Sequence, residues 1–244
     1  MKAIVLAAGL GTRLHPLTLD RPKALVEVAG QTMLERVLRR LQSFGVEEVI
    51  VNVHHHAQMI VDYLAGKNNF GMKIEISREE KLLDTGGGLK RTAEFFLRGN
   101  SDEPFLLHNV DILTSIDLNA IVTAHKASGA LVTLAVKTRA SSRQLLFDND
   151  GLLCGRRAGK AIEWARETAP AEPLAYSCIQ ALSPRIFSLM EEEGAFPIFS
   201  VYLRLAAAGE RIAAYRTDAS YWRDLGRVES MRQAEEDLKA GLCG

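Results

Sequence analysis

The feature that most constrains the fold is an apolar run at the start of the chain that leads at once into a glycine-rich loop. Residues 3–6 are Ala-Ile-Val-Leu, and the segment LAAGLGTRL at positions 6–14 places Gly9 and Gly11 directly behind them. A short apolar run bounded by small residues predicts a buried strand. The strand is therefore expected to present a backbone loop at its carboxyl end, where open α/β sheets bind ligands.

Spacing excludes two common phosphate-binding loops. A dinucleotide fingerprint needs a third glycine where Leu14 stands. A Walker A loop needs a lysine directly after its last glycine, whereas Gly11 is followed by Thr12 and Arg13. The remaining interpretation is an anion-binding nest of the amides of about residues 8–12, with the guanidinium of Arg13 at its exit. A tight strand–loop turn with a surface arginine is the alternative.

Length and charge bound the class of protein. A chain of 244 residues can bury one full core, so we expect a single domain. Lys and Arg number 30, as do Asp and Glu, and this zero net charge argues against a broad nucleic-acid or acidic-membrane surface. The three cysteines show no paired framework, and no apolar run has the length of a membrane span or a signal peptide. We expect a cytoplasmic, soluble protein with a small anionic partner.

Strand and helix patterns alternate through the first 136 residues. Thr32 and Glu35 form a capping box for a helix that ends before Gly45. Further strands are predicted at 48–53, 72–77, 104–108 and 130–136, and further helices at 56–64, 88–97 and 117–126. This βαβ rhythm predicts an α/β fold in which a parallel sheet has helices on both faces.

The pattern changes in the second half of the chain. A hairpin is predicted around residues 149–151, followed by a polar stretch up to Pro173. The later elements are a strand at 174–182, a helix opened by Ser183-Pro184, a helix at 197–208, a strand at 211–216 and a helix at 227–239. We expect residues 137–244 to shape a substrate pocket.

Two aspartates follow strand-like segments far apart in the sequence. Asp111 comes just after an apolar strand in HNVDIL, and Asp224 precedes a glycine in YWRDLG. Because the carboxyl ends of parallel strands share one edge, both carboxylates are expected to meet the glycine loop there. Two carboxylates suit Mg²⁺, which takes its other ligands from phosphate oxygens and water. The alternative for either aspartate is a helix cap or a turn.

Three further segments carry polar or glycine-rich patterns. Arg21-Pro22-Lys23 presents Lys23 as a point charge for a phosphate, the alternative being an exposed loop lysine. The run LDTGGG at 83–88 predicts a turn that opens a helix and offers unshielded amides to a base or a sugar, the alternative being a flexible turn. The histidines at 54–56 are assigned to a strand-to-helix cap and not to a metal, because consecutive side chains point in different directions.

Together, LAAGLGTRLHPLTLDRPKALVEVAG, LLDTGGGL, HNVDIL and WRDLG resemble the sugar-1-phosphate nucleotidyltransferase family. The resemblance covers nearly the whole chain, and the first motif is specific because its glycine loop, Arg13 and Lys23 occur in family order. The short length and the LDTGGGL form resemble the N-acetylmuramate-1-phosphate uridylyltransferase and the mannose- or heptose-1-phosphate guanylyltransferase branches.

The resemblance implies a Rossmann-like, mixed but mainly parallel sheet flanked by helices, the nucleotide-diphospho-sugar transferase fold. Residues 1–136 would form the nucleotide-binding half and 137–244 the sugar-phosphate-binding half of one domain. The implied reaction is attack of a sugar 1-phosphate on the α-phosphorus of an NTP with loss of pyrophosphate. The implied partners are these two substrates, without nucleic acid or membrane, and the chain would act as a monomer or small homo-oligomer.

The resemblance also implies roles for individual residues. Asp111 and Asp224 would hold Mg²⁺, while Arg13, Lys23 and Asp111 would be catalytic. The implied nucleotide-binding set is Leu6, Ala7, Ala8, Gly9, Gly11, Thr12, Arg13, Lys23, Gly86, Gly87 and Asn109, with Gly86 and Gly87 at the base.

Two positions depart from the family pattern. Val110 stands before Asp111 where relatives have glycine, so the loop is expected to be less permissive, and Cys178 occupies a glycine position of the sugar-site strand. The lysine that contacts the sugar phosphate in some longer relatives has no clear counterpart, since Lys160 and Arg166 are only neighbours. Two other functions stay open: a cytidylyltransferase for a non-sugar phosphate such as phosphocholine, and a catalytically silent nucleotide-sugar sensor.

Overall fold

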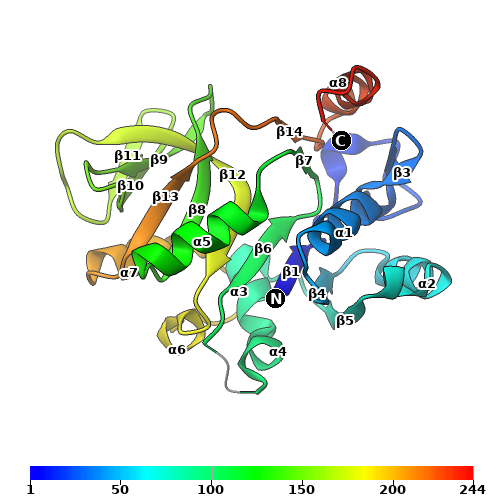
Figure 1. The fold of residues 1–244 in the computed structure, drawn as a ribbon, viewed down its shortest axis with the longest axis horizontal. Helices are drawn as coiled ribbons and strands as arrows, with labels where there is room; N and C mark the ends of the chain where they lie inside the picture. The colour runs from blue at the N-terminus through cyan, green and yellow to red at the C-terminus, as the bar shows by residue number, and fades with distance from the viewer. Residues whose placement is uncertain (100–101, 244) are drawn as a thin grey trace. The chain divides into compact units, whose positions relative to one another are not determined.

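The computed structural model describes residues 1–99 and 102–243, which form two compact units. Unit 1 consists of Met1–Leu82, Leu107–Leu118 and Ser220–Gly244, and unit 2 of Leu83–Leu106 and Asn119–Ala219. Figure 1 shows by colour how each unit collects segments from distant parts of the chain.

Parallel strands form the centre of unit 1. Strand β1 (Lys2–Leu6) pairs with β4 (Glu48–Val53), and β4 pairs with β5 (Lys73–Arg78), both in parallel register. The two connections run through α1 (Met33–Ser43) and α2 (Ala57–Gly66), as the βαβ pattern predicted. The middle of β1 is fully buried because its apolar run packs between the layers.

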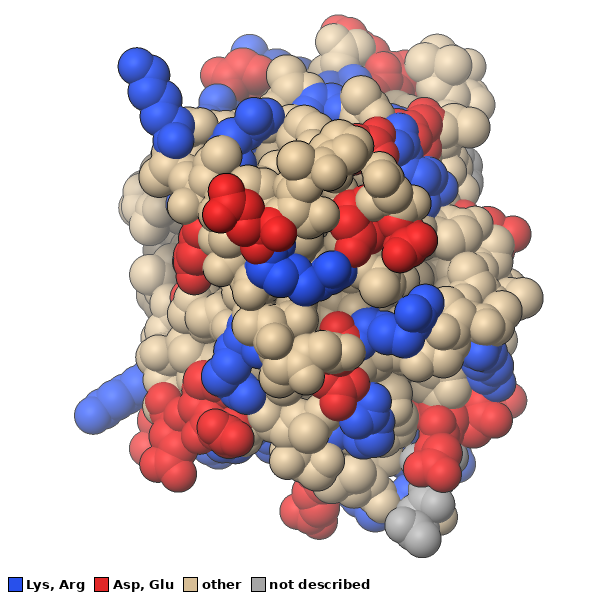
Figure 2. All heavy atoms as spheres, turned by 90° about the vertical axis from the view of Figure 1, so that its left-hand side faces the viewer, with Lys and Arg blue, Asp and Glu red and all other residues tan. Residues whose placement is uncertain are grey.

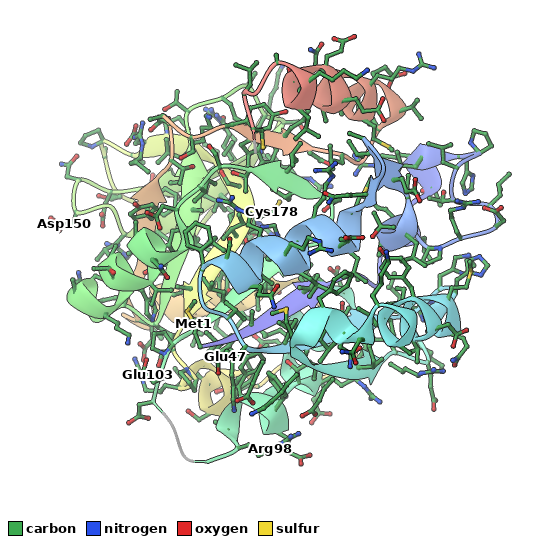
Figure 3. All side chains as sticks on the ribbon, turned by 45° about the vertical axis from the view of Figure 1, so that its right-hand side comes forward. Met1, Glu47, Arg98, Glu103, Asp150 and Cys178 are labelled. Carbon is green, nitrogen blue, oxygen red and sulfur yellow. The ribbon has the colours of Figure 1, made fainter. Side chains whose placement is uncertain are left out.

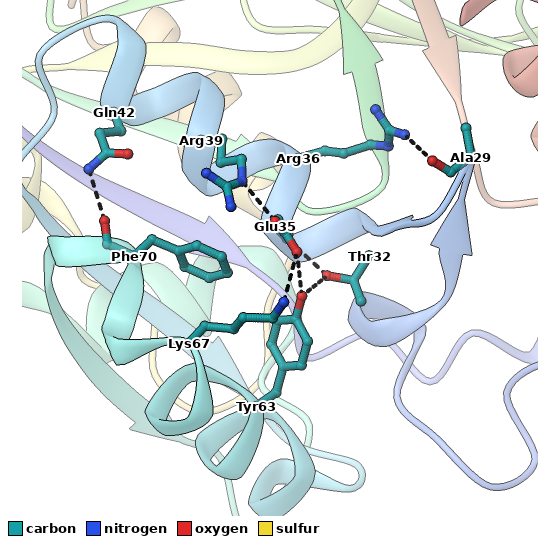
Figure 4. Close-up of polar contacts among 9 residues, drawn as sticks. All are labelled: Ala29, Thr32, Glu35, Arg36, Arg39, Gln42, Tyr63, Lys67 and Phe70. Atoms are coloured by element: carbon teal, nitrogen blue, oxygen red, sulfur yellow. Dashed lines mark hydrogen bonds and ion pairs between the residues drawn. The ribbon is translucent and has the colours of Figure 1, made fainter. Parts of the chain in front are cut away.

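A polar cluster around the buried Glu35 joins α1 to α2. Thr32 Oγ1 accepts a hydrogen bond from Glu35 N at 3.1 Å, which confirms the predicted helix cap. The Glu35 carboxylate does not complete the capping box. It accepts bonds from Tyr63 Oη and Arg39 Nε, both at 2.7 Å, and lies 3.9 Å from Lys67 Nζ (Figure 4). These bonds together lower the pKa of Glu35, although burial alone would raise it.

Unit 1 also contains a short second sheet. Strand β7 (Ile112–Thr114) pairs antiparallel with β14 (Trp222–Asp224), and α8 (Val228–Lys239) contacts β14 (Figure 1). Strand β6 (Phe105–Asn109) spans the division between the units. The other elements are η1 (Thr12–Leu14), η2 (Lys23–Leu25), β2 (Glu27–Val28), β3 (Gln31–Thr32) and η3 (Asn68–Gly71).

Unit 2 is built on the long strand β12 (Glu172–Leu182). Its first residues pair with β9 (Arg143–Phe147) and its remainder with β8 (Val132–Lys137), both antiparallel. Beyond β9 lie β10 (Leu153–Ala158) and β11 (Ala161–Trp164), and β13 (Ile212–Arg216) pairs with β8 in parallel. The predicted hairpin around 149–151 is confirmed, since β9 and β10 flank it.

The helices of unit 2 differ from the predictions at two places. The helix expected at 88–97 is two helices, α3 (Asp84–Arg91) and α4 (Ala93–Leu97). The helix after Ser183-Pro184 is only α6 (Ile186–Leu189), because Met190 leaves helical geometry. The other two helices are α5 (Leu118–Ser128), which begins in unit 1, and α7 (Ile198–Ala207).

The chain thus has the expected α/β class, with a mixed, mainly parallel sheet flanked by helices. Among the described residues, no helix is long and apolar enough to cross a membrane. Lys and Arg lie interspersed with Asp and Glu over the face shown in Figure 2. Unit 2 carries ion pairs such as Arg156–Glu163 and Arg216–Asp218.

Candidate active site

The glycine loop leaves a strand end that is fixed on both sides. Val110 N donates to Leu6 O at 3.1 Å. On the other side, Ala7 N donates to the main-chain oxygen of Asn52 at 3.2 Å and to its Oδ1 at 2.9 Å. Because the N–H of Ala7 is already used, an anion nest begins no earlier than Ala8, in agreement with the sequence interpretation.

Gly11 is the turning point of this loop. Its φ of +69° lies in the left-handed region, and a Cβ there would stand 3.0 Å from both Lys23 Cβ and Thr18 Cγ2. Its carbonyl accepts bonds from Thr18 Oγ1 and Leu14 N, at 2.9 and 2.8 Å. Leu14, where a third glycine was missing, is a fully buried core residue. The chain then continues from η1 to Lys23, at the start of η2, without forming an α-helix.

Accessible polar groups line the outer part of the loop. Gly9, Thr12 and Arg13 are exposed, and no atom stands within 4 Å of a Cβ built at Gly9. These three positions are therefore open to a ligand.

Lys23 is a buried lysine paired with an aspartate. Its side chain is 10% exposed, and its Nζ forms a hydrogen-bonded ion pair with Oδ2 of Asp111, whose side chain is 16% exposed. The alternative of an exposed loop lysine is therefore wrong. The pair joins two segments that are 88 positions apart in the sequence.

Arg13, Lys23 and Asp224 converge at Gly226. A Cβ built on Gly226 would lie 2.8 Å from Arg13 Nη2, 2.8 Å from Asp224 Oδ1 and 3.3 Å from Lys23 Nζ. Only a glycine leaves this space open. Since Lys23 also pairs with Asp111, four of the residues proposed from the sequence lie in one cluster.

The pairing of β7 with β14 brings the two aspartates together. Asp224 lies opposite Ile112, and Leu225 N donates to Asp111 O at 2.9 Å. Asp224 Oδ1 also accepts a bond from Gly226 N at 2.7 Å. The turn interpretation is therefore correct for this oxygen, and it does not prevent the same carboxylate from binding a cation.

Helix α8 anchors the strand that carries Asp224. Asp237 Oδ2 accepts bonds from Tyr221 Oη at 2.6 Å and from Arg223 Nε at 3.0 Å, and Arg223 Nη2 lies 2.7 Å from it. The carbonyl of Tyr221 in turn accepts bonds from Thr114 Oγ1 and Ser115 N, at 2.6 and 3.1 Å. These contacts fix β14 from both its side chains and its backbone.

The donor set at this cluster fits Mg²⁺. No group of three or more His, Cys, Asp or Glu that could hold a metal occurs in the described part of the chain. Mg²⁺, however, needs only one or two carboxylates when phosphate oxygens and water complete its coordination. Asp111, in the turn before β7, and Asp224, on β14, supply two carboxylates beside the cations Arg13 and Lys23 that a polyphosphate needs.

Asn109 ends β6 beside this cluster in sequence. It is half-buried, and its carbonyl accepts a bond from Nδ1 of His108 at 2.7 Å. Burial lowers the pKa of His108 to about 4, so this histidine is neutral near pH 7. His108 therefore adds no positive charge to the loop that carries Asp111.

Unit 2 contains the second glycine-rich segment, and one expectation about it is wrong. The amides of Gly86 and Gly87 are not unshielded, because both donate to Phe196 O, at 2.9 and 3.4 Å. A Cβ would lie 2.4 Å from the Phe196 ring at Gly86 and 2.4 Å from Gly194 O at Gly87. Both glycines are thus required by packing inside unit 2, and any contact with a base would use another part of this segment's backbone or its surface.

Cys178 lies at an irregularity of β12 (Figure 3). The register between β12 and β8 shifts between Tyr176 and Gln180, and Cys178 adopts a φ of +60°. This left-handed position favours glycine, the residue that the resemblance implied here. Close by, Tyr176 O accepts a bond from Arg139 Nη2 at 2.9 Å.

Two other sequence candidates lie in other parts of the structure. His56 occupies the N-cap position of α2 with a φ of +52° but makes no side-chain cap hydrogen bond, and His54 Nδ1 donates to Glu79 O at 2.8 Å. Arg166 pairs with Asp148 at 2.5 Å.

Sequence reasoning missed several residues that build the site. Gly226, Thr18, Asn52, Glu79 and Asp237 were not singled out. Gly226 had one available signal, because it follows Asp224 by two positions in WRDLG. Asn52, Glu79 and Asp237 act through contacts between separate elements, which no local pattern reveals, and Thr18 acts through a bond to Gly11 within the same loop.

Comparisons with known proteins show the family to which the chain belongs. Residues 2–145 match the model of the nucleotidyl transferase family. The chain is 32% identical to N-acetylmuramate alpha-1-phosphate uridylyltransferase of Caulobacter vibrioides, over 97% of this chain and 96% of that protein. It is 28% identical to mannose-1-phosphate guanylyltransferase of Mycobacterium tuberculosis, over 99% of this chain but only 65% of that longer protein.

The fold is shared with solved structures. A crystal structure of UDP-glucose pyrophosphorylase complexed with UDP-glucose has a TM-score of 0.75 at 20% identity and matches over 98% of each chain. The architecture is therefore the nucleotide-diphospho-sugar transferase fold. The chain belongs to the sugar-1-phosphate nucleotidyltransferase family and is an enzyme of that class, as the motifs implied.

Proposed function

We propose that the cluster around Gly226 is the catalytic centre of a Mg²⁺-dependent transfer of a nucleotidyl group from an NTP to a sugar 1-phosphate. The observation that supports it best is the convergence of Arg13, Lys23 and Asp224 at one point, with Asp111 paired to Lys23. Two cations and two carboxylates in one place suit a polyphosphate with its metal ion.

The reaction is an in-line displacement at phosphorus. A phosphate oxygen of the sugar 1-phosphate attacks the α-phosphorus of the NTP and forms a new P–O bond. The bond between the α-phosphorus and the bridging oxygen to the β-phosphate breaks, and pyrophosphate leaves with that electron pair. No protein nucleophile is needed, so catalysis consists of positioning and charge stabilisation.

The residues divide this work. The loop from Leu6 to Thr12 receives the nucleotide, and the exposed guanidinium of Arg13 holds the β- and γ-phosphates of the leaving group. The ammonium of Lys23, held near the reacting phosphates, offsets their developing charge. Asp111 and Asp224 would hold Mg²⁺, which neutralises phosphate charge and orients the oxygens when it is bound.

The two halves of the chain serve the two substrates. Residues 1–136 bind the nucleotide, with Asn109 towards its base and ribose, and residues 137–244 bind the sugar phosphate. The enzyme acts in the cytoplasm as a monomer or small homo-oligomer, without nucleic acid or membrane. The uridylyl- and guanylyltransferase relatives favour UTP or GTP as the donor.

The test is pyrophosphate release with Mg²⁺ across a panel of five NTPs, including dTTP, and several sugar 1-phosphates. One productive pair is expected, and Asp111→Ala should lower its turnover by about 10²-fold or more. Asp62→Asn changes an exposed carboxylate on α2 and should leave turnover unchanged. No turnover with any pair, or full activity of Asp111→Ala, would overturn the proposal. Turnover with phosphocholine alone would support the cytidylyltransferase alternative, and NDP-sugar binding without turnover would support the sensor.

A further inference from the structure

A buried carboxylate lies behind the glycine loop, outside the cluster at Gly226. Glu79 follows β5 directly and is 5% exposed, and its carboxylate oxygen Oε1 accepts a hydrogen bond from Asn52 Nδ2 at 2.6 Å. Asn52, on β4, is 2% exposed and uses its Oδ1 to accept the N–H of Ala7 at 2.9 Å. The three residues form one continuous chain of hydrogen bonds from β5 to the start of the loop.

The direction of this chain is fixed by chemistry. Ala7 N can only donate, so Asn52 must present its carbonyl oxygen to it. The NH₂ group of Asn52 then faces Glu79, whose carboxyl oxygen Oε1 accepts from it and holds the amide in this orientation. The opposite orientation would place a donor against a donor at Ala7 and an oxygen against an oxygen at Glu79.

The backbone of Glu79 is itself anchored. Its N–H donates to Val53 O at 2.8 Å, and its carbonyl accepts the bond from Nδ1 of His54. Strand pairing between β1 and β4 ends at Leu6 opposite Asn52, and the next N–H, that of Ala7, is shared between the main-chain oxygen of Asn52 at 3.2 Å and its side-chain Oδ1 at 2.9 Å. The side chain of Asn52 thus makes the shorter of the two bonds that hold the start of the loop.

We propose that Glu79 and Asn52 are positioning residues for nucleotide binding, which act through Ala7 to hold the glycine loop in its binding conformation. This inference rests on the proposed function, because it takes an NTP as the ligand of the loop. Buried hydrogen bonds to a charged group are the stronger kind, and an unpaired buried amide is costly. Loss of these hydrogen bonds should therefore weaken the loop's affinity for NTP without changing the binding of the sugar phosphate.

A reciprocal exchange tests the direction of the bonds. Asn52→Asp places a carboxylate against Glu79, and Glu79→Gln removes the charge that orients Asn52. In the double variant, the new glutamine amide can donate to the new aspartate, whose other oxygen can accept from Ala7 N. Glu75→Gln, an exposed carboxylate on the same strand β5, is the matched control.

The measurements are NTP affinity by calorimetry, with each of five NTPs, Mg²⁺ and no sugar phosphate, and the separate KM values for NTP and sugar 1-phosphate. We expect each single variant to raise the Kd and the KM for the NTP by about tenfold or more, with the KM for the sugar phosphate unchanged. The double variant should recover most of this loss, and the control should match the wild type.

Three outcomes would overturn the inference while leaving the proposed function intact. These are single variants that bind NTP like the control, equal changes in both KM values, and a double variant worse than either single one. If the single variants have a lower thermal midpoint but unchanged NTP affinity, the hydrogen bonds from Glu79 to Ala7 stabilise the fold and do not position the loop for NTP. If the wild type binds NTP but turns over no sugar phosphate, the proposed function fails, whereas the Kd comparison still decides the inference.

Discussion

Adding one methyl group at Gly226 should separate catalysis from stability. In Gly226→Ala the new carbon would stand 2.8 Å from both Arg13 Nη2 and Asp224 Oδ1, whereas ordinary contact begins at 3.4 Å. Each atom must therefore move by several tenths of an ångström. The guanidinium of Arg13 can move at little cost because its side chain is flexible. Asp224 Oδ1 also accepts a hydrogen bond from Gly226 N, so its displacement would distort that bond.

The expected size of the effect follows from these displacements. A misplacement approaching 1 Å of a group that positions substrate costs up to about 10²-fold in rate, so we expect kcat to fall by about 10- to 100-fold. Gly226 is not in the left-handed region, so alanine fits its backbone. Alanine also restricts the unfolded chain, which stabilises by about 0.4–1 kcal/mol. The thermal midpoint should therefore stay within about 3 °C of wild type.

The assay compares steady-state pyrophosphate release and thermal unfolding for Gly226→Ala and Gly66→Ala. Gly66 ends α2 with open space around it, so the same methyl there should leave turnover unchanged. Unchanged kcat in Gly226→Ala would refute the reasoning, because the chemistry would then lie elsewhere. A fall of the midpoint by much more than about 5 °C would show that the methyl acts on folding instead.

Three other predictions concern residues around and beyond the cluster. Asp237→Ala removes the acceptor of Tyr221 and Arg223, so it should lower the thermal midpoint and raise the Mg²⁺ concentration needed for half-maximal turnover. Burial lowers the pKa of His125 to about 4, so the unfolded chain binds this proton first as the pH falls. Above about pH 6.5 the histidine is neutral in both states and does not change the free energy of unfolding. By pH 4 the free energy of unfolding should fall by about 3 kcal/mol, and urea unfolding of His125→Asn should show a smaller fall over the same pH range. Because Cys178 has a φ of +60°, Cys178→Gly should change the free energy of unfolding by less than about 1 kcal/mol, whereas Cys178→Val should cost about 2 kcal/mol in the same assay.

Local patterns were enough to predict most of unit 1. The strand at 48–53 has the predicted bounds, and the cap at Thr32 is present, because an apolar run and a cap are properties of a few neighbouring residues. Strand β11 (Ala161–Trp164) was missed because it pairs only with β10, and three of its four side chains are exposed. Without a buried face, a strand has no periodic signal.

The start of helix α3 was predicted as a turn, although the structure makes it helical. Three consecutive glycines at 86–88 disfavour a helix by propensity, so the sequence predicted a turn there. The structure makes these residues helical because Gly86 and Gly87 let the helix approach the backbone of Phe196, which a side chain would prevent. Tertiary packing thus overrides propensity at the segment whose amides were expected to be open.

The sequence selected the candidate residues whose positions follow from the order of the strands. It did not select the residues that act through side-chain contacts between separate strands. The rule that ligands bind at the carboxyl ends of strands selected Asp111 and Asp224, and loop spacing selected Lys23. The sequence could not show that Asn52 and Glu79 form a hydrogen bond behind the loop, because the identity of a residue does not reveal whether its side chain is buried.

The two cations of the site should respond differently to removal, because one is exposed and the other is buried with its partner. Arg13 is exposed, so Arg13→Ala should lower turnover while changing the free energy of unfolding by no more than about 0.5 kcal/mol. Lys23→Ala leaves the carboxylate of Asp111 largely buried without its ammonium, which should cost about 2–3 kcal/mol as well as activity. Urea unfolding of both variants, measured without nucleotide, checks this contrast. Equal destabilisation would mean that the Lys23–Asp111 pair contributes nothing to the nucleotide-free fold, and that Lys23 serves the substrate alone.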